Sequence, residues 1–201
     1  MALHYEDERV QITKVVVGPM VNNVFFVRCA ETGESVMVDA ADEPAVLLPL
    51  CRELAVGDVL TTHGHRDHVQ AVRAVRAAGH RVGVAEGDAH MLPAFDFQIA
   101  DEDVIEVGRL CLHALHTPGH TPGSTCFRVE ESPVLLSGDT LFPGGPGNTF
   151  GNRVDFATII RSVQQRLLTL PDDTLVLPGH GDDTTIGAER PHLQEWIDRG
   201  W

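Results

Sequence analysis

Hydrophobic and polar residues are distributed along the chain in a pattern that predicts many short strands and fewer helices. Strands are favoured where Val, Ile, Leu and Phe concentrate between turn residues such as Gly18-Pro19 and Thr32-Gly33. In the first half the predicted strands are Gln11–Val17, Val24–Cys29, Ser35–Asp39, Val59–Thr62 and Arg81–Ala85. In the second half they are Val104–Val107, Leu110–His116, Ser124–Val129, Pro133–Ser137 and Thr174–Leu177.

Apolar residues at three- and four-residue spacing predict helices between these strands. The predicted helices are Glu43–Leu54, Val69–Ala78, Asp155–Leu168 and Gly187–Arg199. Asp42 and Pro44 suit the start of the first helix, Gly79 the end of the second, and Asp155 the N-cap of the third. In residues Gly87–Phe97 the apolar positions follow neither the period of a strand nor that of a helix. The Gly- and Pro-rich segment Leu141–Gly151 predicts a long loop.

The order of these elements predicts an α+β fold of the αββα type, in which two mixed β-sheets face each other and helices cover their outer faces. A chain of 201 residues with 43% hydrophobic and 22% charged residues can form such a core. The segments show no linker and no repeat, so we expect a single domain over residues 1–201.

The charge balance and the apolar runs restrict the partners that we expect. A formal net charge of −14 opposes binding to nucleic acid or to an anionic membrane surface. No apolar run reaches the roughly 18 residues of a membrane span, and the polar N-terminus does not resemble a signal peptide. The four scattered cysteines form no Cys-x-x-Cys pair. We therefore expect a cytoplasmic protein with a small-molecule substrate, and the sequence leaves its oligomeric state open.

The segment His63-Gly-His-Arg-Asp-His68 concentrates three imidazoles and a carboxylate at the end of a predicted strand. These ligand types suit zinc, and also iron or manganese. In extended backbone His63 and His65 point the same way and can reach one ion. As the chain turns into the next helix, Asp67 and His68 can reach a second ion.

Three more ligand-type residues follow predicted strands and are flanked by Gly or Pro. They are His120 in Thr117-Pro-Gly-His-Thr-Pro-Gly123, Asp139 in Leu135-Leu-Ser-Gly-Asp139, and His180 in Val176-Leu-Pro-Gly-His-Gly181. Because each lies at a strand end, we expect these side chains to converge on one edge of the sheets.

These motifs, in this order, resemble those of the metallo-β-lactamase-fold hydrolases, and of their short glyoxalase II-like branch in particular. The resemblance runs from Asp39 to about Glu189. It implies a first ion on His63, His65 and His120, and a second on Asp67, His68 and His180. It further implies that Asp139 bridges the two ions, and that Asp39 supports the site from behind.

The implied activity is hydrolysis of thioesters of the hydroxyacylglutathione type. Two divalent ions, expected to be zinc with iron or manganese as alternatives, would lower the pKa of a shared water and so supply a bridging hydroxide. Asp67 is expected to act as a ligand first and as a catalytic proton carrier second. A mononuclear-iron persulfide dioxygenase on the same scaffold is the alternative, because that family keeps some of the same ligands.

Two sequence features bear on the substrate. Arg153, in Gly151-Asn-Arg-Val-Asp155, partly matches a Gly-Arg-Thr-Asp stretch of related hydrolases and is a candidate for binding a substrate carboxylate. Larger glyoxalase II enzymes carry a basic C-terminal extension that binds glutathione. Only Arg190 and Arg199 supply cationic charge after Glu189 here. We therefore expect weak selection for the whole glutathione tripeptide.

Overall fold

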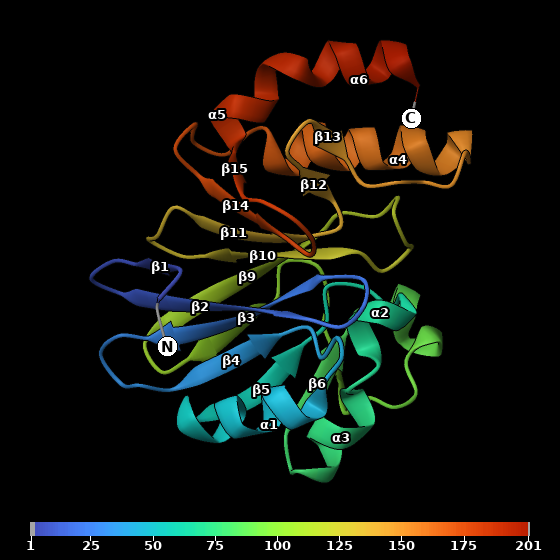
Figure 1. Cartoon of the computed structure of the whole chain (residues 1–201). Helices are drawn as coiled ribbons and strands as arrows, with labels where there is room; N and C mark the ends of the chain where they lie inside the picture. The colour runs from blue at the N-terminus through green and yellow to red at the C-terminus, as the bar shows by residue number, and fades with distance from the viewer. Residues whose placement is uncertain (1–2, 201) are drawn as a thin grey trace.

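The strands form two mixed sheets that lie face to face in a computed structural model, which describes residues 3–200 (Figure 1). The strand order is β1-β2-β3-β4-β5-β6-β7 in the first sheet and β15-β14-β11-β10-β9-β8 in the second. The first sheet contains β1 (Tyr5–Glu6), β2 (Val10–Val17), β3 (Asn22–Cys29), β4 (Ser35–Val38), β5 (Val56–Leu60), β6 (Arg81–Val84) and β7 (Phe97–Gln98). The second contains β8 (Val104–Val107), β9 (Leu110–His116), β10 (Thr125–Val129), β11 (Val134–Gly138), β14 (Leu175–Pro178) and β15 (Thr184–Thr185).

Helices cover the outer face of each sheet, which confirms the predicted αββα arrangement. Figure 1 shows α1 (Pro44–Glu53) and α3 (Val72–Ala77) outside the first sheet. It shows α4 (Arg153–Ser162), α5 (Ile186–Glu189) and α6 (Leu193–Arg199) outside the second.

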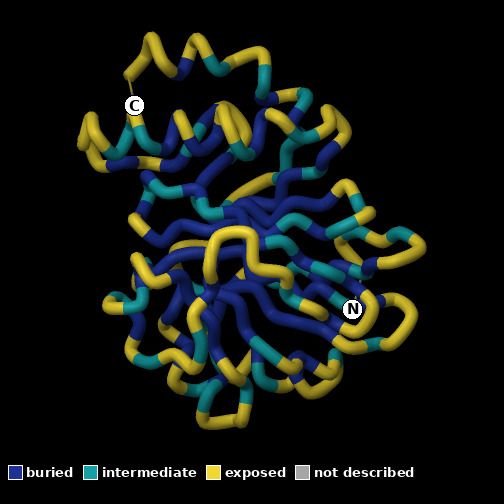
Figure 2. The backbone as a smooth tube through the Cα atoms, turned by 180° about the vertical axis from the view of Figure 1, so that it is seen from behind, coloured by how far each residue is buried: buried dark blue, intermediate teal, exposed yellow. Residues whose placement is uncertain are grey.

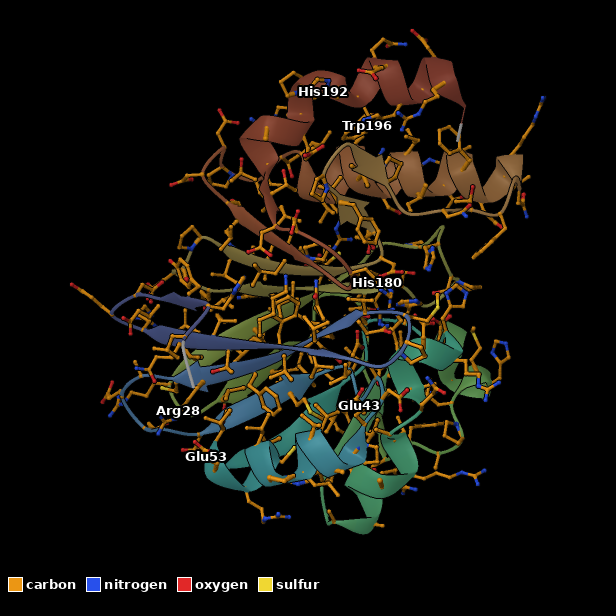
Figure 3. The ribbon with its side chains drawn as sticks, in the orientation of Figure 1. Arg28, Glu43, Glu53, His180, His192 and Trp196 are labelled. Carbon is orange, nitrogen blue, oxygen red and sulfur yellow. The ribbon has the colours of Figure 1, made fainter. Side chains whose placement is uncertain are left out.

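The buried side chains form three apolar layers. Phe25 and Phe127 belong to the layer between the sheets, where Figure 2 shows the most continuous burial. Leu47 belongs to the layer between the first sheet and its helices. Ile159 and Trp196 belong to the layer outside the second sheet, and Figure 3 shows Trp196 between α6 and α4. Successive side chains of a strand point to opposite faces of its sheet, so the apolar residues of the strands make both faces of each sheet apolar.

The predicted helix Val69–Ala78 is wrong, because the chain forms two short helices, α2 (Arg66–Val69) and α3, instead. The backbone N–H groups of Gln70 and Ala71 donate to the carbonyls of Ala41 and Ala40 at 3.0 and 2.9 Å. Hydrogen bonds to the segment after β4 therefore replace those that a continuous helix would make. The break turns α2 toward the ends of the strands.

The predicted N-cap Asp155 is also wrong. The side chain of Asn152 accepts hydrogen bonds from the backbone N–H groups of Val154 and Asp155, so Asn152 caps α4. The α-helical part ends at Ser162, and a π-helical turn, η2 (Val163–Leu167), continues it. Asp155 therefore lies inside the first turn.

Two other predicted segments, a helix and a loop, are divided in the structure. The predicted helix Gly187–Arg199 is divided into α5, the 3₁₀ turn η3 (Arg190–His192) and α6, because Pro191 removes a backbone donor. The predicted loop Leu141–Gly151 contains a small hairpin of β12 (Leu141–Phe142) and β13 (Gly145–Pro146).

The remaining differences lie in both sheets. Strand β5 covers Val56–Leu60 rather than Val59–Thr62, and the short strands β1 and β15 have no counterpart among the predicted strands. The undecided segment Gly87–Phe97 contains most of a 3₁₀ helix, η1 (Glu86–Met91), and the start of β7. Within residues 3–200, no helix combines the length and apolar character needed to cross a bilayer.

Candidate metal centre

Two pairs of parallel strands direct polar residues to the same end of the two sheets. In the first sheet β4 pairs with β5, and Asp39 and His63 follow their carboxyl ends. In the second sheet β11 pairs with β14, and Asp139 and His180 follow theirs. The carboxyl ends of parallel strands meet at one edge, which is where open α/β sheets bind ligands. Figure 3 shows His180 at this end, between the two layers.

The seven ligand-type residues that the sequence singles out come together at this end. They fall into three overlapping groups, in each of which one nitrogen or oxygen atom per residue lies within 4.8 Å of the others. The groups are His63, His65 and His120; His63, His68 and Asp139; and Asp67, His68 and His180. The first and third groups share no residue, and they correspond to the two three-ligand sets that the family resemblance implies.

Distances inside the cluster are those of ligands that share an ion. His63 Nε2 lies 3.1 Å from His65 Nδ1, and His68 Nε2 lies 3.2 Å from His180 Nε2. Two nitrogens on one tetrahedral zinc, each about 2.05 Å from it, are separated by about 3.3 Å. The observed separations fit this geometry.

Asp139 lies between the two sets. Its carboxylate oxygens are 3.6 Å from the Nε2 atoms of His68, His120 and His180. Gly179 allows this approach, because a Cβ there would lie 2.4 Å from Asp139 Oδ1 and 2.7 Å from the His68 ring. The geometry is that of a carboxylate able to contact two neighbouring ions.

Two atoms of the cluster are buried without a hydrogen-bond partner, namely His120 Nε2 and Asp139 Oδ1. Buried polar atoms normally have a hydrogen-bond partner, so two such atoms without one require an explanation. A cation between them supplies it, since neutral imidazole and carboxylate are ligands for divalent metals. The residues present therefore fit a pair of divalent ions.

The charges of the cluster are set by burial and by its carboxylates. Burial and the surrounding imidazoles lower the pKa of His63 well below its ordinary value. Burial also opposes protonation of His68, but the carboxylates of Asp39, Asp139 and Asp67 outweigh it and raise the pKa of His68 to about 9. The hydrogen bond with His180, aided by Asn22 and opposed by burial, holds the pKa of Asp67 well below its usual range. Asp67 is thus an anion ready to bind a cation.

Asp39 contacts the cluster through His68 and Thr62, in the supporting position that the family resemblance implies. Its carboxylate accepts hydrogen bonds from the backbone N–H and the hydroxyl of Thr62, both at 2.8 Å. Its Oδ2 lies 2.8 Å from His68 Nδ1. This contact fixes the ring so that Nε2 faces the cluster, the usual arrangement of a carboxylate behind a metal-binding histidine.

Asp88 is a residue of the site that the sequence patterns do not reveal. It is fully buried and accepts hydrogen bonds from Gly64 N at 2.8 Å, Thr121 Oγ1 at 2.6 Å and Gly123 N at 2.7 Å. One carboxylate therefore ties the His63–His68 segment to the loop that carries His120. Asp88 lies in the segment Gly87–Phe97, for which the sequence predicts neither strand nor helix, and no motif marks it there.

Asn22 and Asn23, at the start of β3, hold the second set of ligands. Asn22 Nδ2 donates to Asp67 Oδ2 at 2.9 Å and lies 3.3 Å from His180 Nε2. Asn23 Nδ2 donates to the carbonyl oxygens of Pro178 and Gly181 at 2.9 and 3.0 Å. The pair Asn22-Asn23 directly before the apolar run of β3 is the sequence signal for these two residues.

The Gly- and Pro-rich loop borders the first set. The carbonyl oxygen of Asn148 lies 2.7 Å from His120 Nδ1 and orients that ring. Phe150 places its ring 5.8 Å from the His65 ring and 6.0 Å from the His120 ring, centroid to centroid. It is 71% exposed and has a φ of 54°, a conformation that non-glycine residues seldom adopt. The loop therefore presents an apolar ring beside the cluster.

Arg153, the predicted substrate-binding residue, lies on the exposed first turn of α4. Its guanidinium forms no hydrogen bond or ion pair with the part of the chain that the structure describes. Its role in binding a substrate carboxylate stays a prediction.

Comparison with known proteins agrees with the fold. Residues 17–180 match the Metallo-beta-lactamase superfamily. The chain is 36% identical over 161 residues to a hydroxyacylglutathione hydrolase of Cereibacter sphaeroides, an alignment that covers 79% of this chain and 62% of that protein. The chain therefore spans less than two thirds of that relative.

Two solved structures are similar over most of their length. The di-iron-bound form of TTHA1623 is 33% identical, with a TM-score of 0.73 over 89% of this chain and 96% of that one. ETHE1 from Myxococcus xanthus is 26% identical, with a TM-score of 0.80 over 93% of this chain and 88% of that one.

Proposed function

The chain belongs to the metallo-β-lactamase superfamily, and from this premise we propose that it is a binuclear metal-dependent hydrolase of thioesters of the hydroxyacylglutathione type. The observation that carries the proposal is the pair of three-ligand groups with Asp139 between them. The similarity to a hydroxyacylglutathione hydrolase supports the substrate class.

In this proposal His63, His65 and His120 hold one ion, and Asp67, His68 and His180 hold the other. Asp139 contacts both. When bound, the ions supply a water activated at neutral pH, polarisation of the acyl carbonyl, and a soft site for the leaving thiolate. The chain contributes the positions of these ligands, which Asp39, Asp88 and the Asn22 amide fix.

Asp67 is proposed to carry a proton in addition to binding an ion. Its Oδ2 receives the Asn22 amide at 2.9 Å and lies 3.2 Å from His180 Nε2. The hydrogen bond with His180 keeps the carboxylate ionised, which favours its role as a ligand. The proposed transfer of a proton rests on the position of Asp67 among the residues that would hold the second ion.

The metal is proposed to be zinc, with iron or manganese as alternatives. All seven ligands are imidazole nitrogens or carboxylates, which suit all three metals. The description of TTHA1623 as a di-iron-bound form makes an iron pair a specific alternative for this chain.

A second candidate function is that of a mononuclear-iron persulfide dioxygenase. The observation in its favour is that His63, His65 and His120 form a complete three-ligand group without any residue of the other set. An iron bound there alone would leave positions open for oxygen and a sulfur substrate.

The test is metal analysis combined with two assays on the same purified protein. We expect about two Zn, Fe or Mn ions per chain, loss of activity on chelation, and hydrolysis of S-lactoylglutathione with a high KM. A panel of hydroxyacyl thioesters of different thiols, and simple lactones, defines the substrate. One iron per chain with oxygen consumption on glutathione persulfide would favour the dioxygenase. No turnover of any thioester by the fully metallated protein would refute the hydrolase.

A further inference from the structure

The turn at residues 178–183 carries His180 and joins β14 to β15 in the second sheet, yet residues of the first sheet hold it. The Asn23 amide donates to the carbonyl oxygen of Gly181 at 3.0 Å. His180 Nδ1 lies 3.0 Å from the carbonyl oxygen of Met20, in the turn between β2 and β3. The direction in which His180 Nε2 points therefore depends on how the two sheets are joined at this place.

Lys14, on β2, adds a cation to this junction. Its Nζ donates to the carbonyl oxygen of Gly181 at 2.9 Å and to Asp183 Oδ1 at 3.4 Å. Only 15% of its side chain is exposed, and its Nζ lies over the Phe25 ring, 5.8 Å from the centroid. Taking an ammonium group out of water is costly unless other groups replace the water. The carbonyl, the carboxylate and the ring face do so, which holds the Lys14 side chain in one position.

Lys14 is the only lysine in the chain, and the other strongly basic residues are arginines. An ammonium presents three N–H groups around one compact charge, whereas a guanidinium presents a flat array suited to a carboxylate or a phosphate. The compact group suits this place, because the Gly181 carbonyl and the Asp183 carboxylate approach it from different residues of one turn. The one lysine thus stands where two acceptors of the His180 turn meet.

Asp183 is held from two sides. Its Oδ2 lies 2.6 Å from His4 Nε2, and its Oδ1 receives the Lys14 ammonium. His4 comes directly before β1, at the edge of the first sheet. The Asp183 carboxylate also offsets the repulsion between Lys14 and a metal ion held by His180. The contacts of Gly181 and Asp183 therefore fix the turn within three positions of the candidate ligand.

We propose that Lys14 is a positioning residue for the second ion. Through Gly181 and Asp183 it holds the turn in the arrangement that places His180 Nε2 3.2 Å from Asp67 Oδ2. The inference rests on the proposed function, since His180 is taken to be a ligand of that ion. No motif of the sequence marks Lys14, because its partners stand 167 and 169 positions away in the chain.

The first ion does not depend on this contact. Lys14 has no hydrogen bond or ion pair with His63, His65 or His120 within residues 3–200. Loss of Lys14 should thus weaken the second site and spare the first. Because the proposed hydrolase requires both ions and the dioxygenase only the first, the hold of Lys14 on His180 bears on which of the two chemistries the centre supports.

Zinc affinities measured by competition with chelators test the proposal. Lys14→Met removes the ammonium but keeps an unbranched apolar stem that can still lie on Phe25. It should weaken zinc binding at the second site by about 10- to 100-fold, as loss of a group that orients a ligand typically does, and leave the first site unchanged. His180→Ala, in which only the first site remains complete, identifies the affinity of that site. Wild-type affinity at both sites in Lys14→Met would overturn the proposal.

Arg9→Gln is the matched control. Arg9 also joins the two sheets, through an ion pair with Glu131 at 2.7 Å. It precedes β2 at the end remote from Asn22, which marks the cluster end of β3. Both zinc affinities should be unchanged in this variant. A loss at the second site equal to that in Lys14→Met would show that any weakened contact between the sheets suffices, and would refute a specific role of Lys14.

A single lysine also gives a direct spectroscopic test. Protein labelled with [ε-13C]lysine has one side-chain signal, that of Lys14. The signal should shift when zinc fills the second site in the wild type, and it should stay in place when zinc binds to His180→Ala. A signal that ignores zinc in wild-type protein with two bound ions would contradict the positioning role.

These measurements separate the inference from the proposed function. No turnover of thioesters by protein with two bound zinc ions would refute the hydrolase, and the affinities of Lys14→Met would still decide the role of Lys14. If the wild type binds one ion only, the binuclear proposal fails, and the NMR signals of the His180 ring in the metal-free protein decide instead. In Lys14→Met these signals should shift and broaden, because the turn is no longer held, whereas those of His63 should not. Unchanged His180 signals would refute the inference.

Discussion

At the scale of single residues, the position of Asp139 distinguishes it from the other candidate ligands. It is 3.6 Å from imidazoles of both three-ligand sets, whereas His180 contacts one set only. We therefore expect Asp139→Ala to lower the metal content of both sites, and His180→Ala to empty mainly the second. Elemental analysis after reconstitution with zinc checks this. Full and equal occupancy in the two variants would contradict the assignment of Asp139 as the shared ligand.

Asp88 allows a second prediction at this scale, because it holds two metal-bearing segments without touching the cluster itself. Asp88→Asn loses the charge that accepts from Gly64, Thr121 and Gly123, so His63, His65 and His120 become less well aligned. Loss of such a supporting hydrogen bond typically weakens metal affinity by about 10- to 100-fold. Competition with a chelator measures it.

A matched control exists for Asp88→Asn. Asp96 also accepts from a backbone N–H, that of Val82 at 2.9 Å, but its other partner is Arg76 on α3. Asp96→Asn should leave the metal affinity unchanged. Equal affinities in both variants and the wild type would show that Asp88 has no part in aligning the ligands.

The residues of the site divide into those that the sequence could and could not predict. All seven candidate ligands lie in short motifs of Gly, Pro, His and Asp, which mark them without a structure. Asp88 and Asn22 have no such motif. Their partners stand 24 to 35 and 45 to 158 positions away in the chain, so their roles arise only from the folding of distant segments.

At the scale of elements, strands and helices were predicted where the apolar period alone determines them. The facing sheets and the outer helices are confirmed on this basis. The period cannot show where a long-range hydrogen bond interrupts a helix. The break between α2 and α3 depends on Ala40 and Ala41, about thirty positions earlier in the chain.

The start of α4 provides the prediction at this scale. Asn152, and not the predicted Asp155, accepts the free N–H groups of the first turn. Asn152→Ala should therefore lower the free energy of unfolding by about 1 kcal/mol. Asp155→Ala should cost only about 0.3 to 1 kcal/mol, through the loss of a negative charge near the helix N-terminus. Chemical denaturation of both variants measures the difference, and a larger loss for Asp155→Ala would restore the original prediction.

At the scale of the whole molecule, the cluster lies where the two sheets meet. His63 and His68 follow strands of the first sheet, and Asp139 and His180 follow strands of the second. Ions bound there connect the two halves, so metal binding should stabilise the entire fold. The sequence showed which residues converge, but the charges they acquire on burial depend on the completed structure.

Those charges make the stabilisation by metal depend on pH. The Asp39, Asp139 and Asp67 carboxylates outweigh burial and raise the pKa of His68 from an ordinary 6.5 to about 9 in the metal-free protein. A raised pKa contributes stability that is complete below pH 6.5 and is lost as the pH rises through 9. The metal-free protein should thus become less stable over this interval. Metal binding requires the neutral ring, so metal affinity should increase over the same interval, by up to about tenfold per pH unit for each proton displaced.

As the pH rises, the metal-free protein loses stability and metal affinity increases. Both changes enlarge the difference in stability between the metal-loaded and the metal-free protein. The Tm of zinc-loaded protein minus that of chelator-stripped protein should widen from pH 6.5 to pH 9. Calorimetric titration with zinc at pH 7 in buffers of different ionisation enthalpy should also detect proton release. Asp39→Asn keeps an acceptor for the Thr62 N–H but removes the charge beside His68, so it should release fewer protons and show a flatter Tm difference. A constant Tm difference in the wild type, or equal proton release in Asp39→Asn, would mean that His68 does not carry this coupling.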